Sequence, residues 1–182
     1  DPSTMFLADR RTGIPGSAVV PTMEGRRPIV VELQALTSPG LENVPKRRSA
    51  QGIDGSRLSM LMAVLGQRGR VKVGNQDVYA SAAGGAKLTE PGLDLGICLA
   101  VASAMHDIPL PADMAVFGEV GLGGEVRQVG HAPRRVTEAA RLGFRSVIVP
   151  AKSPEPDDGL NGVRLIRVAT LVEALRKAGL NQ

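Results

Sequence analysis

The sequence has few aromatic side chains, which make up 2% of its 182 residues: three Phe, one Tyr and no Trp. Proteins that bind single-stranded nucleic acids without sequence preference stack the bases on exposed aromatic rings. The composition therefore argues against a single-strand binder of this type. A single cysteine, Cys98, excludes a disulfide framework and a cysteine-based zinc site, and it fits a reducing, cytoplasmic setting.

Histidines and long apolar runs are also scarce. His106 and His131 are the two histidines, and neither has a neighbour at metal-ligand spacing, so no metal site is expected. No apolar run approaches the roughly 18 residues that a membrane span needs, so no membrane association is expected. The sequence contains no GxxxxGK[ST] motif, and this chain by itself is not expected to bind ATP through a P-loop. We therefore expect no cofactor within it.

Apolar residues are numerous enough for one substantial core, because 43% of the side chains are hydrophobic. We expect a single domain covering residues 1–182. The chain begins at Asp1 without a methionine, which suggests a fragment of a longer protein.

Alternating β-branched stretches and amphipathic segments interleave along the chain. The patterns predict a hairpin or meander over 17–36, a strand at 77–85, a strand pair over 114–130 and a buried strand at 144–150. They predict helices within 53–69, starting near Asp54 or Ser56, from Pro91 to about His106, at 131–143 and at 168–179, with loops at 36–52 and 151–162. The fold class is therefore α+β (mixed α/β), with interleaved β-hairpins and helices.

The net charge of +4 is concentrated in the first part of the chain. Residues 1–75 carry 11 Lys or Arg against 6 Asp or Glu, whereas residues 76–182 carry 11 against 12. The densest cationic segment lies at 44–57, and its cations are Lys46, Arg47, Arg48 and Arg57. Such a run is often only a solvated surface, but it is also the composition with which proteins contact DNA phosphates without reading sequence.

Two arginine pairs are weaker candidates for DNA contacts. Arg26 and Arg27 lie between the two strands of the predicted hairpin, where they are expected to be exposed. Arg134 and Arg135 lie near the start of a predicted helix and are likewise expected at the surface.

The stretch TEPGLDLGICLAVA, residues 89–102, predicts a helix with a carboxylate in its first turn. Asp94 shares one face of that helix with Ile97, Cys98, Val101 and Met105. A charge on an inward face is costly unless it is paired or hydrogen-bonded. The simpler explanation is the helix macrodipole, which favours an anion near the N-terminus by roughly 0.3–1 kcal/mol. The alternative is that this turn is a functional position.

Two segments, AGGAKLTEPGLDLGICLAVA and FGEVGLGGEVRQVGHAPRRVTEAARLGFRSVIVP, resemble in their order the proteolytic domain of Lon proteases. In that family a helix turn carries a nucleophilic serine within a Gly-Pro-Ser-Ala-Gly sequence, and a later helix carries the lysine that acts as its base. The resemblance places Asp94 at the serine position and Pro133 at the lysine position. A serine needs a neighbouring base to become nucleophilic, and proline has no amine to accept a proton. The resemblance therefore implies a Lon-like fold with a vacant dyad and no catalytic residue.

A Lon-like fold with these substitutions resembles the RadA (Sms) family of bacterial DNA-repair and recombination ATPases. The resemblance runs through nearly the whole chain, including DPSTMFLADR, PGSAVVPTMEG, RRSAQGIDGSRLSMLMAVL and NQDVYASAAGGAKLTEPGLDLGI. Members have an N-terminal four-cysteine zinc finger, a RecA-like ATPase core and a C-terminal Lon-like domain, and this chain resembles the last of these. The resemblance implies a DNA-dependent ATPase as the parent protein, with ATP, Mg and Zn bound in its missing N-terminal parts.

From this resemblance we expect a non-enzymatic scaffold that binds duplex DNA without sequence specificity. It implies a homo-oligomer, a hexameric ring, that supports branch migration of recombination intermediates, and a RecA-type recombinase as a further partner. A different class of function stays open: a peptide-binding pseudo-protease that holds partners in the old cleft, or a residual serine hydrolase. Ser81 and Lys87 are the nearest substitute pair, but they precede the helix and have no reason to face each other.

Overall fold

The computed structural model describes residues 1–156 and 162–181. A seven-stranded mixed sheet in the order β3-β4-β2-β1-β5-β8-β9 organises them, and β6 and β7 form a separate pair. The strands are β1 (Ser17–Glu24), β2 (Arg27–Pro39), β3 (Arg48–Gln51), β4 (Gln76–Ala82), β5 (Met114–Val116), β6 (Glu119–Val120), β7 (Val126–Arg127), β8 (Ser146–Pro150) and β9 (Arg164–Val168). The helices are α1 (Pro2–Leu7), α2 (Gly55–Gln67), α3 (Asp94–His106), α4 (Ala132–Arg141) and α5 (Leu171–Lys177), with 3-10 turns η1 (Ala83–Gly85) and η2 (Pro91–Leu93). The predicted α+β class is confirmed.

The hairpin β1–β2 is the long element to which the other strands add. Its antiparallel register pairs Val20 with Val31, and both side chains are buried. The turn between the strands uses Gly25 at a φ of 62°, a backbone conformation that glycine adopts without steric cost. On one side β4 pairs antiparallel with β2, and on the other β1 begins the parallel series β1-β5-β8-β9.

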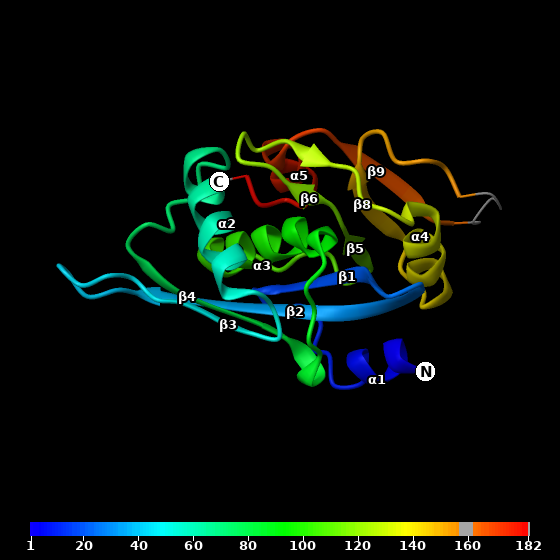
Figure 1. Cartoon of the computed structure of the whole chain (residues 1–182), viewed down its shortest axis with the longest axis horizontal. Coiled ribbons are helices and arrows are strands. Elements are labelled where there is room, and N and C mark those ends of the chain that lie inside the picture. Colours follow the sequence, from blue (N-terminus) through cyan, green and yellow to red (C-terminus); the bar gives the residue numbers. More distant parts are fainter. Residues whose placement is uncertain (157–161, 182) are drawn as a thin grey trace.

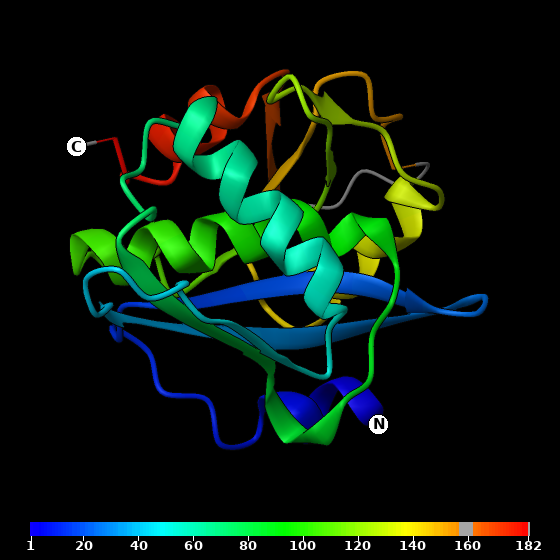
Figure 2. The same ribbon diagram turned by 60° about the vertical axis from the view of Figure 1, so that its left-hand side comes forward.

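Helix α3 packs on β1 and β2, and α2 crosses over α3, so that two helical layers cover one face of the sheet (Figures 1 and 2). Helix α1 and η1 lie against the opposite face of β2 (Figure 2). The close approach of α3 to β1 requires Gly96, because a Cβ there would lie 2.4 Å from Val20 Cγ2.

Helix α3 is buried on all sides in its first ten residues, from Asp94 to Ser103. The prediction of one inward face was therefore too narrow, since Leu95, Leu99 and Ala102 on the other faces are also buried. A helix that is apolar all round belongs in the interior of a domain. The carboxylate of Asp94 is thus enclosed by protein whichever way it points.

Three further predictions differ from the structure. The predicted strand pair over 114–130 holds three strands, because β5 joins the parallel series of the main sheet while β6 and β7 pair with each other. The predicted loop at 36–52 holds the end of β2 and the edge strand β3, which pairs parallel to β4 from Arg48 to Gln51. The predicted helix at 168–179 begins at Leu171, because the residues before Ala169 form β9, a strand that the sequence analysis did not identify. The predicted loop at 151–162 lies partly outside the described residues. Within the described part, no helix is long and apolar enough to cross a membrane.

Candidate functional site

Asp94, at the position that the Lon resemblance assigns to a nucleophile, is 1% exposed and makes an ion pair with Arg57. Arg57 comes from the first turn of α2, which Asp54 caps by accepting the Ser56 N–H. The Arg57 Nε donates to Asp94 Oδ1 at 2.7 Å and its Nη2 donates to Oδ2. The Val120 N–H of β6 also donates to Oδ2, at 3.0 Å. The carboxylate therefore holds α2, α3 and β6 together.

This geometry corrects the macrodipole explanation for Asp94. The helix dipole contributes at most roughly 1 kcal/mol, whereas the arginine partner neutralises the charge directly. The hydrogen bond to Asp94 raises the pKa of Arg57, although partial burial opposes it. Arg57, predicted as a DNA contact, thus has its charge committed within the fold.

A second buried ion pair joins the same region to α4. Arg135, predicted at the surface, is 3% exposed, and that prediction was wrong. Its Nη1 and Nη2 donate to the two oxygens of Glu90, the latter at 3.1 Å, and Nε donates to the Gly130 carbonyl. Glu90 also accepts the Thr22 hydroxyl at 2.6 Å. The helix that carries Pro133 is thereby fixed to the segment that precedes Asp94.

Glu90 combines burial with strong hydrogen bonding. Burial acts to raise its pKa, but the hydrogen bonds from Arg135 and Thr22 outweigh that effect and hold the pKa of Glu90 below its ordinary value. The carboxylate is therefore ionised at neutral pH. The sequence carried one signal for it: Glu90 directly precedes Pro91, and its side chain accepts the Gly92 N–H as the cap of η2.

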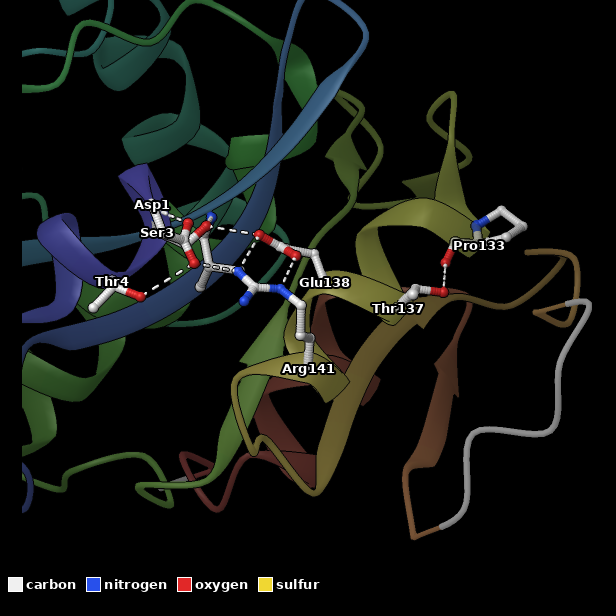
Figure 3. A network of polar contacts seen from close by, with 8 residues as sticks. Asp1, Ser3, Thr4, Pro133, Thr137, Glu138 and Arg141 are labelled. Atoms are coloured by element: carbon white, nitrogen blue, oxygen red, sulfur yellow. Dashed lines mark hydrogen bonds and ion pairs between the residues drawn. The ribbon is translucent and has the colours of Figure 1, made fainter.

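Pro133, at the position that the resemblance assigns to the catalytic lysine, lies in the first turn of α4 (Figure 3). Its carbonyl accepts the Thr137 hydroxyl at 2.9 Å. The helix is fastened elsewhere, because Glu138 and Arg141 point toward α1 (Figure 3). Glu138 accepts from Arg141 Nε at 2.7 Å and from Ser3 Oγ at 2.9 Å. These contacts hold the pKa of Glu138 below its usual range.

Very little free space lies beside Asp94. The cavity between Arg57, Glu90 and Asp94 has a volume of about 10 Å³. That is about the space of one water molecule and far too small for a peptide segment. The open alternative of a partner held in the old cleft thus finds no room next to this turn.

The alternative pair Ser81 and Lys87 does not form a site. Ser81 lies on β4 beside Gln34 and Gln51, on an open sheet surface. Lys87 is exposed beyond η1. In the described part of the chain, no group of three or more His, Cys, Asp or Glu residues could hold a metal ion.

The cationic segment at 46–48 divides into different environments. Lys46 Nζ folds back on the carbonyls of its own loop, Leu41 and Val44. Arg48 donates to the Val73 carbonyl at 3.2 Å and to the Gln76 carbonyl, and thereby ties β3 to the segment before β4.

The remaining predicted cations are exposed. Arg47 is exposed, with its backbone N–H bonded to Asp77 Oδ1 at 2.7 Å. Arg26 and Arg27 are exposed at the turn of the β1–β2 hairpin, as expected.

The fold and the site together define a class: an α+β domain in which the two positions that the Lon resemblance assigns to a dyad are an ion-paired Asp94 and Pro133. Comparison with known proteins finds DNA repair protein RadA of Bacillus subtilis, 49% identical over 177 residues, which are 97% of this chain and 38% of that protein. RadA of Listeria monocytogenes is 44% identical over 98% of this chain, and RadA of Mycolicibacterium smegmatis is 42% identical over 97%. The chain is therefore a homologue of part of RadA, and the predicted resemblance is confirmed.

These similarities differ in how much of each protein they cover. The chain spans 38–39% of the length of these relatives. Residues 79–153 are also similar to the family described as subunit ChlI of Mg-chelatase. That segment includes Glu90, Asp94 and Arg135 but not Arg57, so it covers one complete buried pair and half of the other.

Proposed function

We propose that this chain is the DNA-binding scaffold domain of a RadA-type DNA repair protein and that it performs no catalysis itself. The observation that carries the proposal is the similarity to proteins named DNA repair protein RadA over 97% of the chain. The cationic segment near 46–48 supplies the chemistry, because Lys and Arg contact duplex phosphates without reading the base sequence.

The absence of catalysis rests on the two positions of the vacant dyad. Asp94 holds Arg57 and the Val120 N–H and is not poised as a nucleophile. Pro133 has no amine to accept a proton. Cleavage of an unfolded protein substrate that is lost in Ser81→Ala would contradict this part of the proposal.

The wider setting of the proposal follows the family resemblance. The parent protein would be a cytoplasmic, DNA-dependent ATPase that binds ATP, Mg and Zn outside this chain. Copies of the chain would assemble into a hexameric ring that supports branch migration, with a RecA-type recombinase as a partner. Repetition of the cationic segment around a ring would strengthen the attraction for DNA through multivalency.

Binding of a labelled DNA duplex at several salt concentrations tests the proposal. We expect an affinity in the range typical of sequence-independent binding, a Kd of about 10⁻⁴ to 10⁻⁶ M, that falls steeply with salt. Lys46→Glu/Arg47→Glu is expected to weaken binding, because it reverses two charges of the cationic segment. The carbonyls that Lys46 contacts, Leu41 and Val44, belong to its own exposed loop. Arg48 is left intact in this variant, since its loss would also release the Val73 and Gln76 carbonyls.

The matched control is Arg145→Glu/Arg164→Glu, which changes the net charge by the same amount. Both arginines are exposed, and they are neighbours where the Arg164 N–H donates to the Arg145 carbonyl at 2.9 Å. Arg145 directly precedes β8 and lies with Ala140 and Arg141 of α4 around one pocket. Helix α4 lies at the end of the molecule opposite the loop that joins β2 and β3 (Figure 1). Failure of the unmodified chain to bind the duplex would overturn the proposed function.

A further inference from the structure

A stretch without acidic residues runs from Gly55 to Gln76. It contains α2 and the connection to β4, and its cations are Arg57, Arg68, Arg70 and Lys72. Three of the four fall within the five residues 68–72 that follow the helix. No acidic neighbour along the chain offsets their charge.

The connection holds two of these cations outward on a fixed backbone. Val71 and Val73 are 2% and 1% exposed, whereas Arg70, which precedes Val71, and Lys72, which lies between the two valines, are exposed. The Val71 N–H donates to the Leu65 carbonyl at 3.2 Å. Because the valines are buried in the core, the cations are presented without the cost of ordering a mobile loop.

Hydrogen bonds bring this connection beside the cationic segment at 46–48. Arg48 donates to the Val73 carbonyl at 3.2 Å, and the Gly40 N–H donates to the Asn75 carbonyl at 2.9 Å. Both views show the connection after α2 and the β2–β3 loop at the same end of the molecule (Figures 1 and 2). The segments that carry Arg47 and Lys72 are thus neighbours.

The cations of this region differ in what their head groups already contact. Arg57 is paired with Asp94, Arg48 bonds backbone carbonyls, and the Arg68 Nε donates to the Leu122 carbonyl at 3.3 Å. In the part of the chain that the structure describes, the side chains of Arg47, Arg70 and Lys72 make no ion pair. These three charges remain available for an external anion.

We propose that Arg47, Arg70 and Lys72 form one phosphate-binding surface for the backbone of duplex DNA, the 47–72 surface. Arg48 positions it by fastening β3 to the connection, and Arg57 does not take part. The inference rests on the proposed function and adds Arg70 and Lys72, which lie outside the cationic segment at 44–57, to Arg47 within it. Contacts of this kind are expected to be insensitive to base sequence and sensitive to salt.

The test is the salt dependence of duplex binding by Arg70→Glu/Lys72→Glu in the 182-residue chain. Each phosphate contact that is lost lowers the slope of log K against log salt by about 1, so the double variant is expected to lose about 2. Arg145→Glu/Arg164→Glu, with the same change in charge, is expected to keep the slope of the unmodified chain. If the Glu variant does not fold, Arg70→Gln/Lys72→Gln replaces it in the measurement of the slope. This variant also removes the two phosphate contacts but introduces no negative charge.

The outcomes separate the inference from the proposed function. If the unmodified chain binds the duplex and the Arg70/Lys72 variants keep its slope, the 47–72 surface is wrong while DNA binding stands. An equal loss of slope in the control and in the Arg70/Lys72 variants would also overturn it, since net charge alone would then explain the effect. No binding by the unmodified chain would overturn both.

Discussion

A buried carboxylate needs partners, and Asp94 depends on a residue 37 positions earlier in the chain. The two members of this pair are not equivalent, because Asp94 is 1% exposed whereas the Arg57 side chain is 31% exposed. Loss of the arginine would leave an uncompensated charge in the interior, while loss of the aspartate would leave a cation that water can reach. The larger cost therefore falls on removal of Arg57.

Arg57→Ala is expected to lower the free energy of unfolding by about 3 kcal/mol, the lower end of the range for removing one member of a buried pair, because Arg57 is partly exposed. Urea denaturation measures the change. The exposed Arg145→Ala is the control, with an expected effect within about 0.5 kcal/mol. Arg57→Met/Asp94→Leu should recover part of the loss, since neither charge then remains while the Val120 N–H loses its acceptor. Equal stability of the Arg57→Ala and Arg145→Ala proteins would rule out a stabilising role for the pair.

At the residue scale the sequence indicated the unusual positions but not their partners. Asp94 was recognisable because a charge fell on an apolar helix, and Arg57 because it lay in a cationic segment. Their contact depends on how α2 crosses α3, which local periodicity does not contain. Arg135 was misjudged for the same reason: a basic residue on a helix start is usually exposed, and only its partner Glu90, 45 positions away, allows its burial.

At the element scale, most elements were predictable, but α1, β3 and β9 were not. The β1–β2 hairpin and the helices α2, α3 and α4 follow from alternation, capping and apolar spacing, which are local signals. Strand β3 has only four residues, RSAQ, and exists because β4 provides a parallel partner. Helix α1 likewise depends on contacts elsewhere, since Ser3 Oγ accepts the Val30 N–H at the point of β2 that β4 does not reach.

The Glu90–Arg135 pair connects two elements, so its titration is expected to appear in the stability of the fold. The pKa of Glu90 is lower in the folded chain than its ordinary value. Its contribution is therefore fully present above the unfolded pKa of about 4.3 and is lost as the pH falls through the folded pKa. Glu90→Gln should cost about 2 kcal/mol at neutral pH.

The stability difference between Glu90→Gln and the unmodified chain should shrink as the pH falls from about 5 to about 3. Denaturation of both proteins across that range measures it, because all other carboxylates titrate alike in the two. Glu155→Gln, at a side chain that is 76% exposed, is expected to give a much smaller difference at neutral pH. A difference for Glu90→Gln that does not change with pH would show that the pair acts through packing and not through charge.

At the scale of the whole molecule, the cations proposed to bind DNA are different residues from the ion pairs that stabilise the fold. Ion pairs join α2 to α3 through Asp94, and α4 to the segment before α3 through Glu90. Of the 47–72 surface, Arg70 and Lys72 follow the end of α2 and Arg47 directly precedes β3, so none of these residues belongs to the ion pairs. The chain can therefore lose exposed charge at this surface without losing the contacts that stabilise it, so that binding and folding can be tested by different substitutions.

The proposed ring supplies a final prediction about the whole molecule. One copy offers only a few phosphate contacts. When several copies are linked, binding of the first copy to the DNA raises the effective concentration of the other copies at the same duplex. We expect light scattering of the chain to give a mass that is a multiple of the 19.0 kDa of one copy and that falls on dilution. Duplex affinity should fall over the same dilution, because a separated copy keeps its own contacts but loses those of its neighbours. A strict monomer at high concentration would show that this chain does not suffice to assemble the ring, and duplex binding that stays unchanged on dilution would show that it does not need one.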